Sequence, residues 1–207
     1  MEFSEIIAKI LGDPVRIRVY KILILRPQGA SGRELGRLAG TSPFKIHQIL
    51  KALVAQSVLR ETITGRVHLY RLNEEHRLVH DVIRPLIRYE GDLLNRLGNE
   101  IRNRFRPKPI SVILYGSVAR GEERPDSDLD VLLIDDDRRR GKRGRLEAGE
   151  ALEAVERSFG NPLRLIRMTA SEFKMKSRGK DPLIRNILKE GKAISGLTMT
   201  EILNYGR

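Results

Sequence analysis

The sequence lacks several features that define whole classes of protein. It has no cysteine and no tryptophan, and only 5% of its residues are aromatic. Without cysteine it cannot form disulfide bonds, thiolate zinc sites or a cysteine nucleophile. No apolar run approaches the roughly 20 residues that span a bilayer, and the N-terminus has no basic-then-apolar signal pattern. These absences predict a cytoplasmic protein with no membrane partner.

The remaining composition is that of a folded, basic protein. The 207 residues allow one large domain or two small ones, and the hydrophobic share of 40% is enough for ordinary cores. The net charge of +12 favours polyanionic partners such as nucleic acid, although ion-pair networks also produce arginine-rich surfaces. Residues 1–72 carry 12 basic and 5 acidic side chains, whereas residues 108–207 carry 20 and 16. The excess charge is concentrated at the N-terminus.

Two prolines mark a boundary between two halves of the chain. Pro107 and Pro109 cannot continue a helix and favour an extended path. Before them the sequence shows helical periodicity and one hairpin, and after them short β-rich runs alternate with helical ones. We therefore expect an α+β protein with domains at 1–72 and 108–207, joined by a helical connector at 73–107.

Three short helices are expected in the N-terminal half. Asp13 and Pro14 supply the N-cap and first residue of one helix, and Ser31 caps a second that Gly40 closes. The third opens at Ser42 and extends to about residue 56. Its apolar residues recur at steps of three and four, which predicts one buried stripe consisting of Ile46, Ile49, Leu50 and Leu53. Two β-prone runs follow, at 58–63 and 67–72, around a turn at 64–66 that predicts a hairpin.

This order of three helices and a basic hairpin resembles the winged helix-turn-helix domains of prokaryotic transcriptional regulators, over residues 10–72. The resemblance implies that the third helix enters the major groove of duplex DNA and that the hairpin, or wing, contacts the backbone. Two other interpretations stay open: these residues form the solvated face of a helix, or the domain docks a protein. The residues that would face DNA are Ser42, Lys45, His47, Gln48 and Lys51 on the helix, and Arg66 and His68 on the wing.

Two further segments have a less specific pattern. Residues 74–104 are amphipathic and interrupted by Pro85 and Gly91, which predicts one kinked helix or two shorter ones. The apolar stripe of this segment fits either the seam of a homodimer or packing on its own domain. Residues 135–145 combine charge with glycine and are interpreted as a loop rather than a phosphate clamp.

The most informative motif lies in the C-terminal half. A buried strand at 110–115 ends at Gly116 and Ser117, and a second strand begins at Asp128. Residues two apart in a strand share a face, so Asp128 and Asp130 lie side by side. Such a pair is favourable when a divalent cation lies between the carboxylates, and Mg²⁺ suits oxygen ligands together with substrate phosphates. Gly116 would let the backbone approach a phosphate that Ser117 and nearby N–H groups hold.

The block resembles the polymerase-beta-like nucleotidyltransferase superfamily, and its "GSVARG" and "SDLD" segments look like those of minimal nucleotidyltransferases, over residues 108–195. The resemblance implies transfer of a nucleoside monophosphate from a triphosphate to a hydroxyl, with two Mg²⁺ ions. It assigns Gly116 and Ser117 to the phosphates, and Asp128 and Asp130 to the metal and to catalysis. Arg120 would steady a phosphate or, alternatively, pair with Glu122 or Glu123.

One departure from the family pattern puts catalysis in doubt. Active members add a third carboxylate on a later strand, whereas the matching strand here, at 162–168, carries Arg164 and no acid. An arginine cannot act as a base at neutral pH, and its charge repels a second cation. The candidates for a substitute carboxylate are Asp135, Asp136 and Glu172.

Together these patterns lead to one main hypothesis and two alternatives. The main hypothesis is a DNA-binding regulator whose nucleotidyltransferase-like domain binds a Mg²⁺-nucleoside triphosphate with weak or absent transfer activity. The first alternative is an active transferase that modifies a protein, RNA or small molecule, as antitoxins acting on a partner toxin do. The second is an interaction module that kept both folds and neither chemistry.

Overall fold

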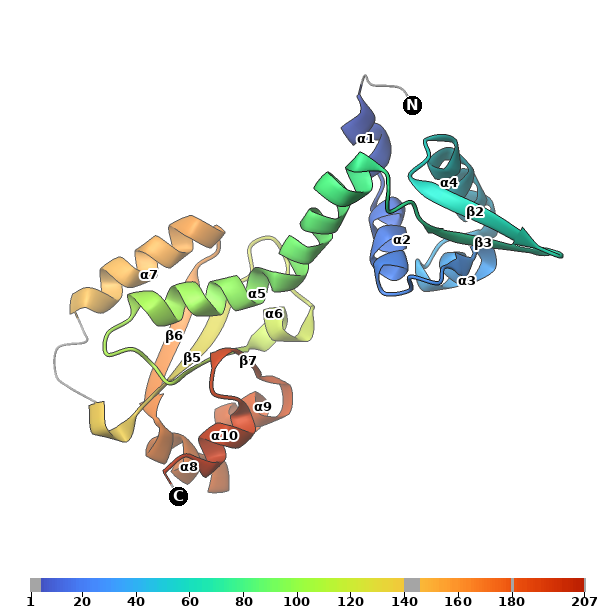
Figure 1. The fold of residues 1–207 in the computed structure, drawn as a ribbon. Coiled ribbons are helices and arrows are strands. Elements are labelled where there is room, and N and C mark those ends of the chain that lie inside the picture. Colours follow the sequence, from blue (N-terminus) through green and yellow to red (C-terminus); the bar gives the residue numbers. More distant parts are fainter. Residues whose placement is uncertain (1–4, 140–145, 180, 207) are drawn as a thin grey trace. The chain divides into compact units, whose positions relative to one another are not determined.

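The computed structural model describes residues 5–139, 146–179 and 181–206, and the chain divides into two compact units between Gly91 and Asp92 (Figure 1). Each unit is described by itself. The structure confirms the predicted α+β class, because helices and two separate sheets occur together. Among the described residues, no helix is long and apolar enough to cross a membrane.

The helices of the N-terminal unit begin at the predicted caps. The side chain of Asp13 accepts a hydrogen bond from the amide of Val15 at 2.7 Å, and Ser31 and Ser42 cap their helices in the same way. The predicted stripe on the third helix is buried as expected and joins one core. The helices are α1 (Ile6–Leu11), which the sequence analysis missed, α2 (Pro14–Ile24), α3 (Gly32–Leu38) and α4 (Pro43–Ala55).

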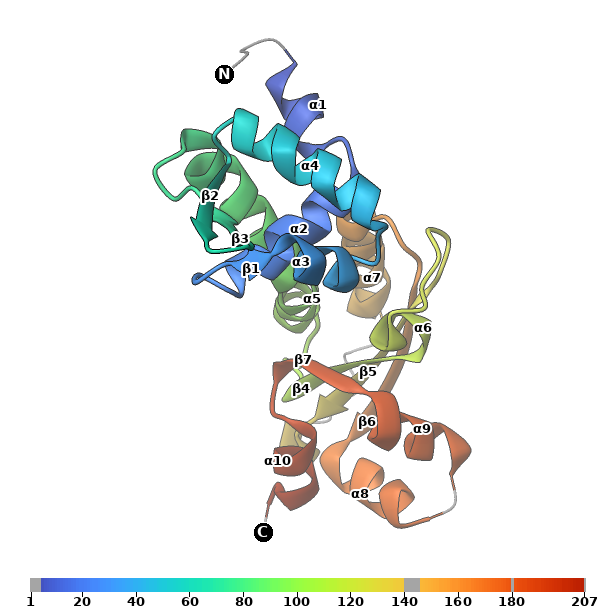
Figure 2. The same ribbon diagram turned by 90° about the vertical axis from the view of Figure 1, so that its right-hand side faces the viewer.

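A three-stranded antiparallel sheet completes this unit. The predicted hairpin is present as β2 (Leu59–Thr64) and β3 (Val67–Leu72), and Gly65 in its turn has a φ of 62°. The two-residue strand β1 (Ala30–Ser31) adds to the other edge of β3, which gives the order β1-β3-β2. Figure 2 shows α3 and α4 beside these strands. Helices followed by a hairpin whose inner strand pairs with a short strand form a winged-helix arrangement.

The connector is helical without the predicted break. A π-helical turn, η1 (Val79–Ile83), is followed by α5 (Arg84–Arg104). Pro85 lies just after the π-helical turn, which continues into α5 without a break, and Gly91 lies within α5. Of the two predicted alternatives, that of two shorter helices is therefore wrong, and one helix contains both residues.

The C-terminal unit is built on a four-stranded mixed sheet with the order β6-β5-β4-β7 (Figure 1). The central strands pair antiparallel, whereas β5 and β6 pair parallel. The three strands predicted at 110–115, from Asp128 and at 162–168 begin within about a residue of their expected starts, and a fourth strand pairs with the other edge of the first. The four strands are β4 (Ser111–Tyr115), β5 (Leu129–Asp135), β6 (Leu163–Thr169) and β7 (Lys192–Gly196).

Helices cover both faces of this sheet, so alternate residues of its strands enter two different cores. Leu129, Val131 and Leu133 pack with the C-terminal half of α5 and with α7. Leu132 and Ile134 pack on the other face, with α8, α9 and α10. The remaining elements are α6 (Gly116–Arg120), the 3-10 helix η2 (Asp137–Arg139), α7 (Leu146–Phe159), α8 (Ala170–Arg178), α9 (Pro182–Glu190) and α10 (Met199–Asn204).

The segment predicted as a loop at 135–145 begins in regular structure. Asp135 is the last residue of β5, and η2 follows at Asp137–Arg139. Residues 140–145 lie outside the described part of the chain.

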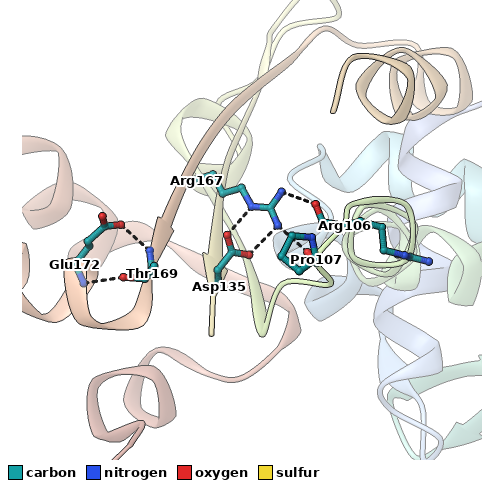
Figure 3. A network of polar contacts seen from close by, with 6 residues as sticks. All are labelled: Arg106, Pro107, Asp135, Arg167, Thr169 and Glu172. Carbon is teal, nitrogen blue, oxygen red and sulfur yellow. Dashed lines mark hydrogen bonds and ion pairs between the residues drawn. The ribbon is translucent and has the colours of Figure 1, made fainter. Parts of the chain in front are cut away.

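A buried ion pair attaches the chain after α5 to the sheet (Figure 3). Arg167 on β6 donates from Nε to Asp135 Oδ2 at 2.6 Å and from Nη2 to Asp135 Oδ1 at 3.0 Å. It also donates to the carbonyl oxygens of Arg106 and Pro107, at 3.2 and 2.6 Å. Asp135 is 4% exposed, so water does not weaken this pair. Arg167 thus joins two strands and the segment that enters β4.

Replacing Arg167 with alanine should destabilise the protein strongly. The change leaves the buried carboxylate of Asp135 unpaired, which typically costs about 3 kcal/mol or more of unfolding free energy. Urea denaturation measures the loss. The matched control is Arg157→Ala, which removes an exposed pair with Glu153 and should cost less than about 0.5 kcal/mol. Equal losses in the two variants would show that the buried pair contributes nothing special.

Candidate nucleotide and nucleic-acid sites

The turn between β4 and α6 brings the glycine and one aspartate of the motif together. Gly116 has a φ of 77°, a conformation that side chains other than glycine rarely adopt. A Cβ built on Gly116 would lie 2.3 Å from Asp130 Oδ2, because Tyr115 pairs with Asp130 across the sheet. In this structure the missing side chain of Gly116 makes room for a carboxylate of the protein itself.

The environment of Asp130 disfavours its negative charge. Burial raises the pKa of Asp130 above its usual value, and the Asp128 carboxylate acts in the same direction. The guanidinium groups of Arg164 and Arg120 oppose this effect. The pKa of Tyr115 is likewise raised, by burial and then by the charge of Asp130. A raised carboxylate pKa without a structural partner is a feature of functional sites.

The position expected for a third carboxylate holds Arg164. In the parallel register of β5 and β6, Asp130 lies next to Arg164, so their side chains share a face. The Nε of Arg164 lies 2.7 Å from Asp128 Oδ2. The guanidinium group therefore supplies the positive charge beside the paired carboxylates.

Of the other predicted site residues, Arg120 has partners of its own. Arg120 donates to Glu122 at 2.6 Å and to Glu190 at 2.9 Å, so the predicted alternative of an ion pair applies to this structure. Ser117 lies in α6, whose five residues make it a short helix. Of these contacts, the one to Glu190 on α9 was not expected.

None of the suggested substitute carboxylates lies at the site. Asp135 is five residues further along β5, about 17 Å at the usual rise of a strand, and it binds Arg167. Glu172 accepts from the amide of Thr169 in a capping box, and Asp136 accepts from the amide of Arg138. These three acids serve other contacts.

The donor set fits one divalent cation and does not fit two. Asp128 and Asp130 provide hard oxygen ligands of the kind that Mg²⁺ prefers, and such a cation would neutralise developing charge on a bound phosphate. A second cation would need the third carboxylate that Arg164 replaces. Consistently, the described residues include no group of three or more histidine, cysteine or acidic side chains that could hold a metal ion.

In the N-terminal unit, α4 exposes most of the residues predicted to face DNA. His47, Gln48 and Lys51 are exposed; the charge of His47 acts on Glu61, and no partner of Gln48 or Lys51 is found among the described residues. Lys45 instead lies 3.1 Å from Asp13 Oδ2. The Ser42 hydroxyl accepts from the amide of Lys45 as the helix cap. Two of the five predicted helix residues therefore already have structural contacts.

The two predicted wing residues differ in their contacts. Arg66 at its turn is exposed and has no partner among the described residues. His68 Nδ1 lies 2.8 Å from Glu61 Oε1, the same oxygen that accepts from the Tyr70 hydroxyl at 2.7 Å. These two hydrogen bonds, that from His68 first, lower the pKa of Glu61. A negative charge thus lies beside His68.

A groove next to these residues contains cations that the sequence analysis missed. It has a volume of about 980 Å³ and lies between α3, α4 and the wing, with an apolar floor that includes Tyr70. Arg33 and Arg37 of α3 line it together with Arg66, and none of the three guanidinium groups has a partner in the described part of the chain. The four-residue spacing of Arg33 and Arg37, which places both on one helix face, was the available signal.

Comparison with known proteins gives one family match, which lies within the C-terminal unit. Residues 94–194 match the family model described as "Nucleotidyltransferase domain". The match begins in α5 and ends within β7, so it includes β4, β5 and β6 and the paired aspartates. No curated protein matches the chain.

Several solved structures show a partial likeness to the chain. A toxin–antitoxin structure with AMP-PNP is 16% identical at a TM-score of 0.37, covering 55% of this chain and 77% of that chain. The putative HTH-type transcriptional regulator ytcD is 21% identical at 0.38, covering 46% and 100%. The MarR family regulator SPO1453 from Silicibacter pomeroyi DSS-3 is 20% identical at 0.34, covering 41% and 62%. These scores are low and carry no conclusion about what this chain binds or does.

Replacing Gly116 with alanine should cost more stability than the same change at Gly121. Gly121 also has a positive φ, of 73°, but a Cβ there would meet nothing within 4 Å. Gly121→Ala should therefore lose about 1 kcal/mol of unfolding free energy from backbone strain alone. Gly116→Ala adds the collision with Asp130 and should lose about 1 kcal/mol more. Equal losses in urea denaturation would mean that the Asp130 carboxylate moves aside freely.

Proposed function

We propose that the chain is a DNA-binding regulator whose winged-helix unit binds duplex DNA and whose nucleotidyltransferase domain binds a nucleoside triphosphate with Mg²⁺. In this proposal the nucleotide is a regulatory ligand, and transfer of a nucleoside monophosphate is weak or absent. Both partners place the protein in the cytoplasm.

The observation that carries the DNA-binding half is the set of unpaired cations around one groove. Arg33, Arg37 and Arg66 come from two elements and line the same concave surface. Some other arginines of this unit are paired by contrast, namely Arg26 with Glu34 and Arg60 with Glu75. Guanidinium groups without a protein partner gain most from binding phosphate, because no internal ion pair has to be broken. The exposed face of α4 beside this groove would then read bases, through Gln48 and Lys51.

Removing the two arginines of α3 should weaken DNA binding in a salt-dependent manner. Each lost phosphate contact lowers the slope of log K against log salt by about 0.9, so Arg33→Ala with Arg37→Ala should lower it by about 2. Fluorescence anisotropy with a labelled duplex at several salt concentrations measures this slope. Arg60→Ala with Arg104→Ala removes the same charge from two paired arginines and should leave the slope unchanged. Equal slopes in the two double variants would refute the groove as the DNA-binding surface.

The nucleotide-binding half rests on Asp130, which lies against Gly116, and on Asp128, whose charge acts on Asp130; both lie within the matched residues. Calorimetric titration with Mg²⁺-ATP should show binding to the wild type and none to the Asp128→Asn, Asp130→Asn double variant. Asp126→Asn is the control, since Asp126 is an exposed acid in the same loop. Loss of binding in this control, or absence of binding in the wild type, would contradict the proposal.

The alternative function is transfer of a nucleoside monophosphate to a hydroxyl of a protein, an RNA or a small molecule, with a partner toxin as one acceptor. Incubation with labelled triphosphate, Mg²⁺ and candidate acceptors distinguishes it from the regulatory role, because only a transferase labels an acceptor. The stoichiometry of the DNA titration also tests a homodimer. Such a dimer would use the apolar residues that α5 exposes, Leu86, Tyr89 and Leu93.

A further inference from the structure

Arg164 is the side chain of the nucleotide site whose role the proposed function does not explain. Its Nε contacts Asp128 at 2.7 Å, while 74% of its side chain is exposed. A guanidinium group has five N–H donors, and this contact uses one of them. The charge of Arg164 also acts on Asp130, and no second hydrogen bond or ion pair of Arg164 is found among the described residues. The group that neutralises Asp128 therefore retains donors for another anion.

The ion pair between Arg164 and Asp128 is also easy to break. Water screens an exposed pair, and holding a long side chain in one geometry costs entropy, so such pairs contribute little to stability. The pair between Arg167 and Asp135 on the same two strands is the opposite case, because it is buried and bidentate. Of the two arginines of β6 that bind acids of this sheet, only Arg164 is free to change partner at low cost.

A cation and a triphosphate affect this contact in opposite ways. A divalent cation that arrives alone must compete with the guanidinium group for Asp128, and the two positive charges repel each other. A phosphate group offers Arg164 two oxygens in the geometry that a guanidinium fork prefers. Binding of phosphate therefore removes the competitor of the cation.

We propose that Arg164 is a phosphate-binding residue that transfers from Asp128 to the phosphates of a bound nucleoside triphosphate. Its departure makes Asp128 available to the divalent cation, so that the two ligands bind together better than either binds alone. This inference rests on the proposed nucleotide binding. Arg164 then has two roles. Without nucleotide it weakens binding of the divalent cation, and with nucleotide bound it strengthens that binding.

The test compares two ligands in the full-length protein. Binding of Mn²⁺ alone is measured by electron paramagnetic resonance, counting only the site that the Asp128→Asn, Asp130→Asn double variant removes. Binding of Mg²⁺-ATP is measured by calorimetry. In Arg164→Ala, Mn²⁺ alone should bind on the order of fivefold more tightly because the competing pair is gone. Mg²⁺-ATP should bind on the order of fivefold more weakly, because a charge-assisted phosphate contact outweighs an exposed pair.

Two further variants make the comparison specific. Arg157→Ala removes an exposed arginine on α7 that pairs with Glu153, and it should change neither affinity. Arg164→Lys keeps the positive charge but loses the planar fork. It should hold Mn²⁺ binding near the wild-type value and still weaken Mg²⁺-ATP.

The pattern of signs decides the outcome. If Arg164→Ala increases the affinity for both Mn²⁺ alone and Mg²⁺-ATP, the arginine only blocks the site and the inference is overturned. If it changes neither, Arg164 has no part in binding and the inference is again overturned. If wild type and variant both fail to bind Mg²⁺-ATP, the proposed nucleotide function fails along with the inference. Wild-type binding thus separates the failure of one from the failure of both.

Discussion

The parallel register of β5 and β6 is the constraint on which the chemistry of the C-terminal unit depends. It sets Asp130 beside Arg164 at one end of the strand pair and Leu133 beside Arg167 near the other. Strand β6 thereby supplies a guanidinium group to an acid at each end of β5. One of these pairs is exposed and exchangeable, and the other is buried and structural. Both ends of this strand pair carry an arginine and an aspartate. The buried pair stabilises the fold, whereas the exposed pair is the one proposed to take part in ligand binding, because the two pairs differ in burial.

Most of the fold could be predicted from local signals. The caps Asp13, Ser31 and Ser42 gave the helix starts of the winged-helix unit, because capping depends on residues only two or three positions apart. The strand β1 was missed, since two residues carry no periodicity and their pairing with β3 spans a long stretch of chain. The sequence left two shorter helices open as an alternative around Pro85, because it does not show the π-helical turn that precedes Pro85 and continues into α5.

In the candidate sites, too, short-range features could be predicted from the sequence and long-range contacts could not. The Gly-Ser and Asp-x-Asp motifs were recognisable because their spacing is short, and the arginine opposite them followed from strand order. Contacts between distant residues were not recognisable. Lys45 pairs with Asp13, and Arg120 pairs with Glu190, 70 residues away, so both cations are less available than their motifs suggest. Arg33 and Arg37 are the opposite case, because their guanidinium groups have no partner among the described residues. Nothing in the sequence indicates which cations lack a partner.

The contact between Asp13 and Lys45 links folding to recognition within the winged-helix unit. The Asp13 carboxylate caps α2 through the amide of Val15 and also holds Lys45 of α4, and these contacts, that with Val15 first, lower its pKa. One side chain therefore secures the start of one helix and restrains a cation on the helix proposed to read DNA. Evolution towards tighter but less selective DNA binding could replace Asp13. Such a change would release Lys45 and would at the same time weaken the start of α2. A substitution of Asp13 that increases DNA affinity would therefore also lower the thermal stability of the winged-helix unit.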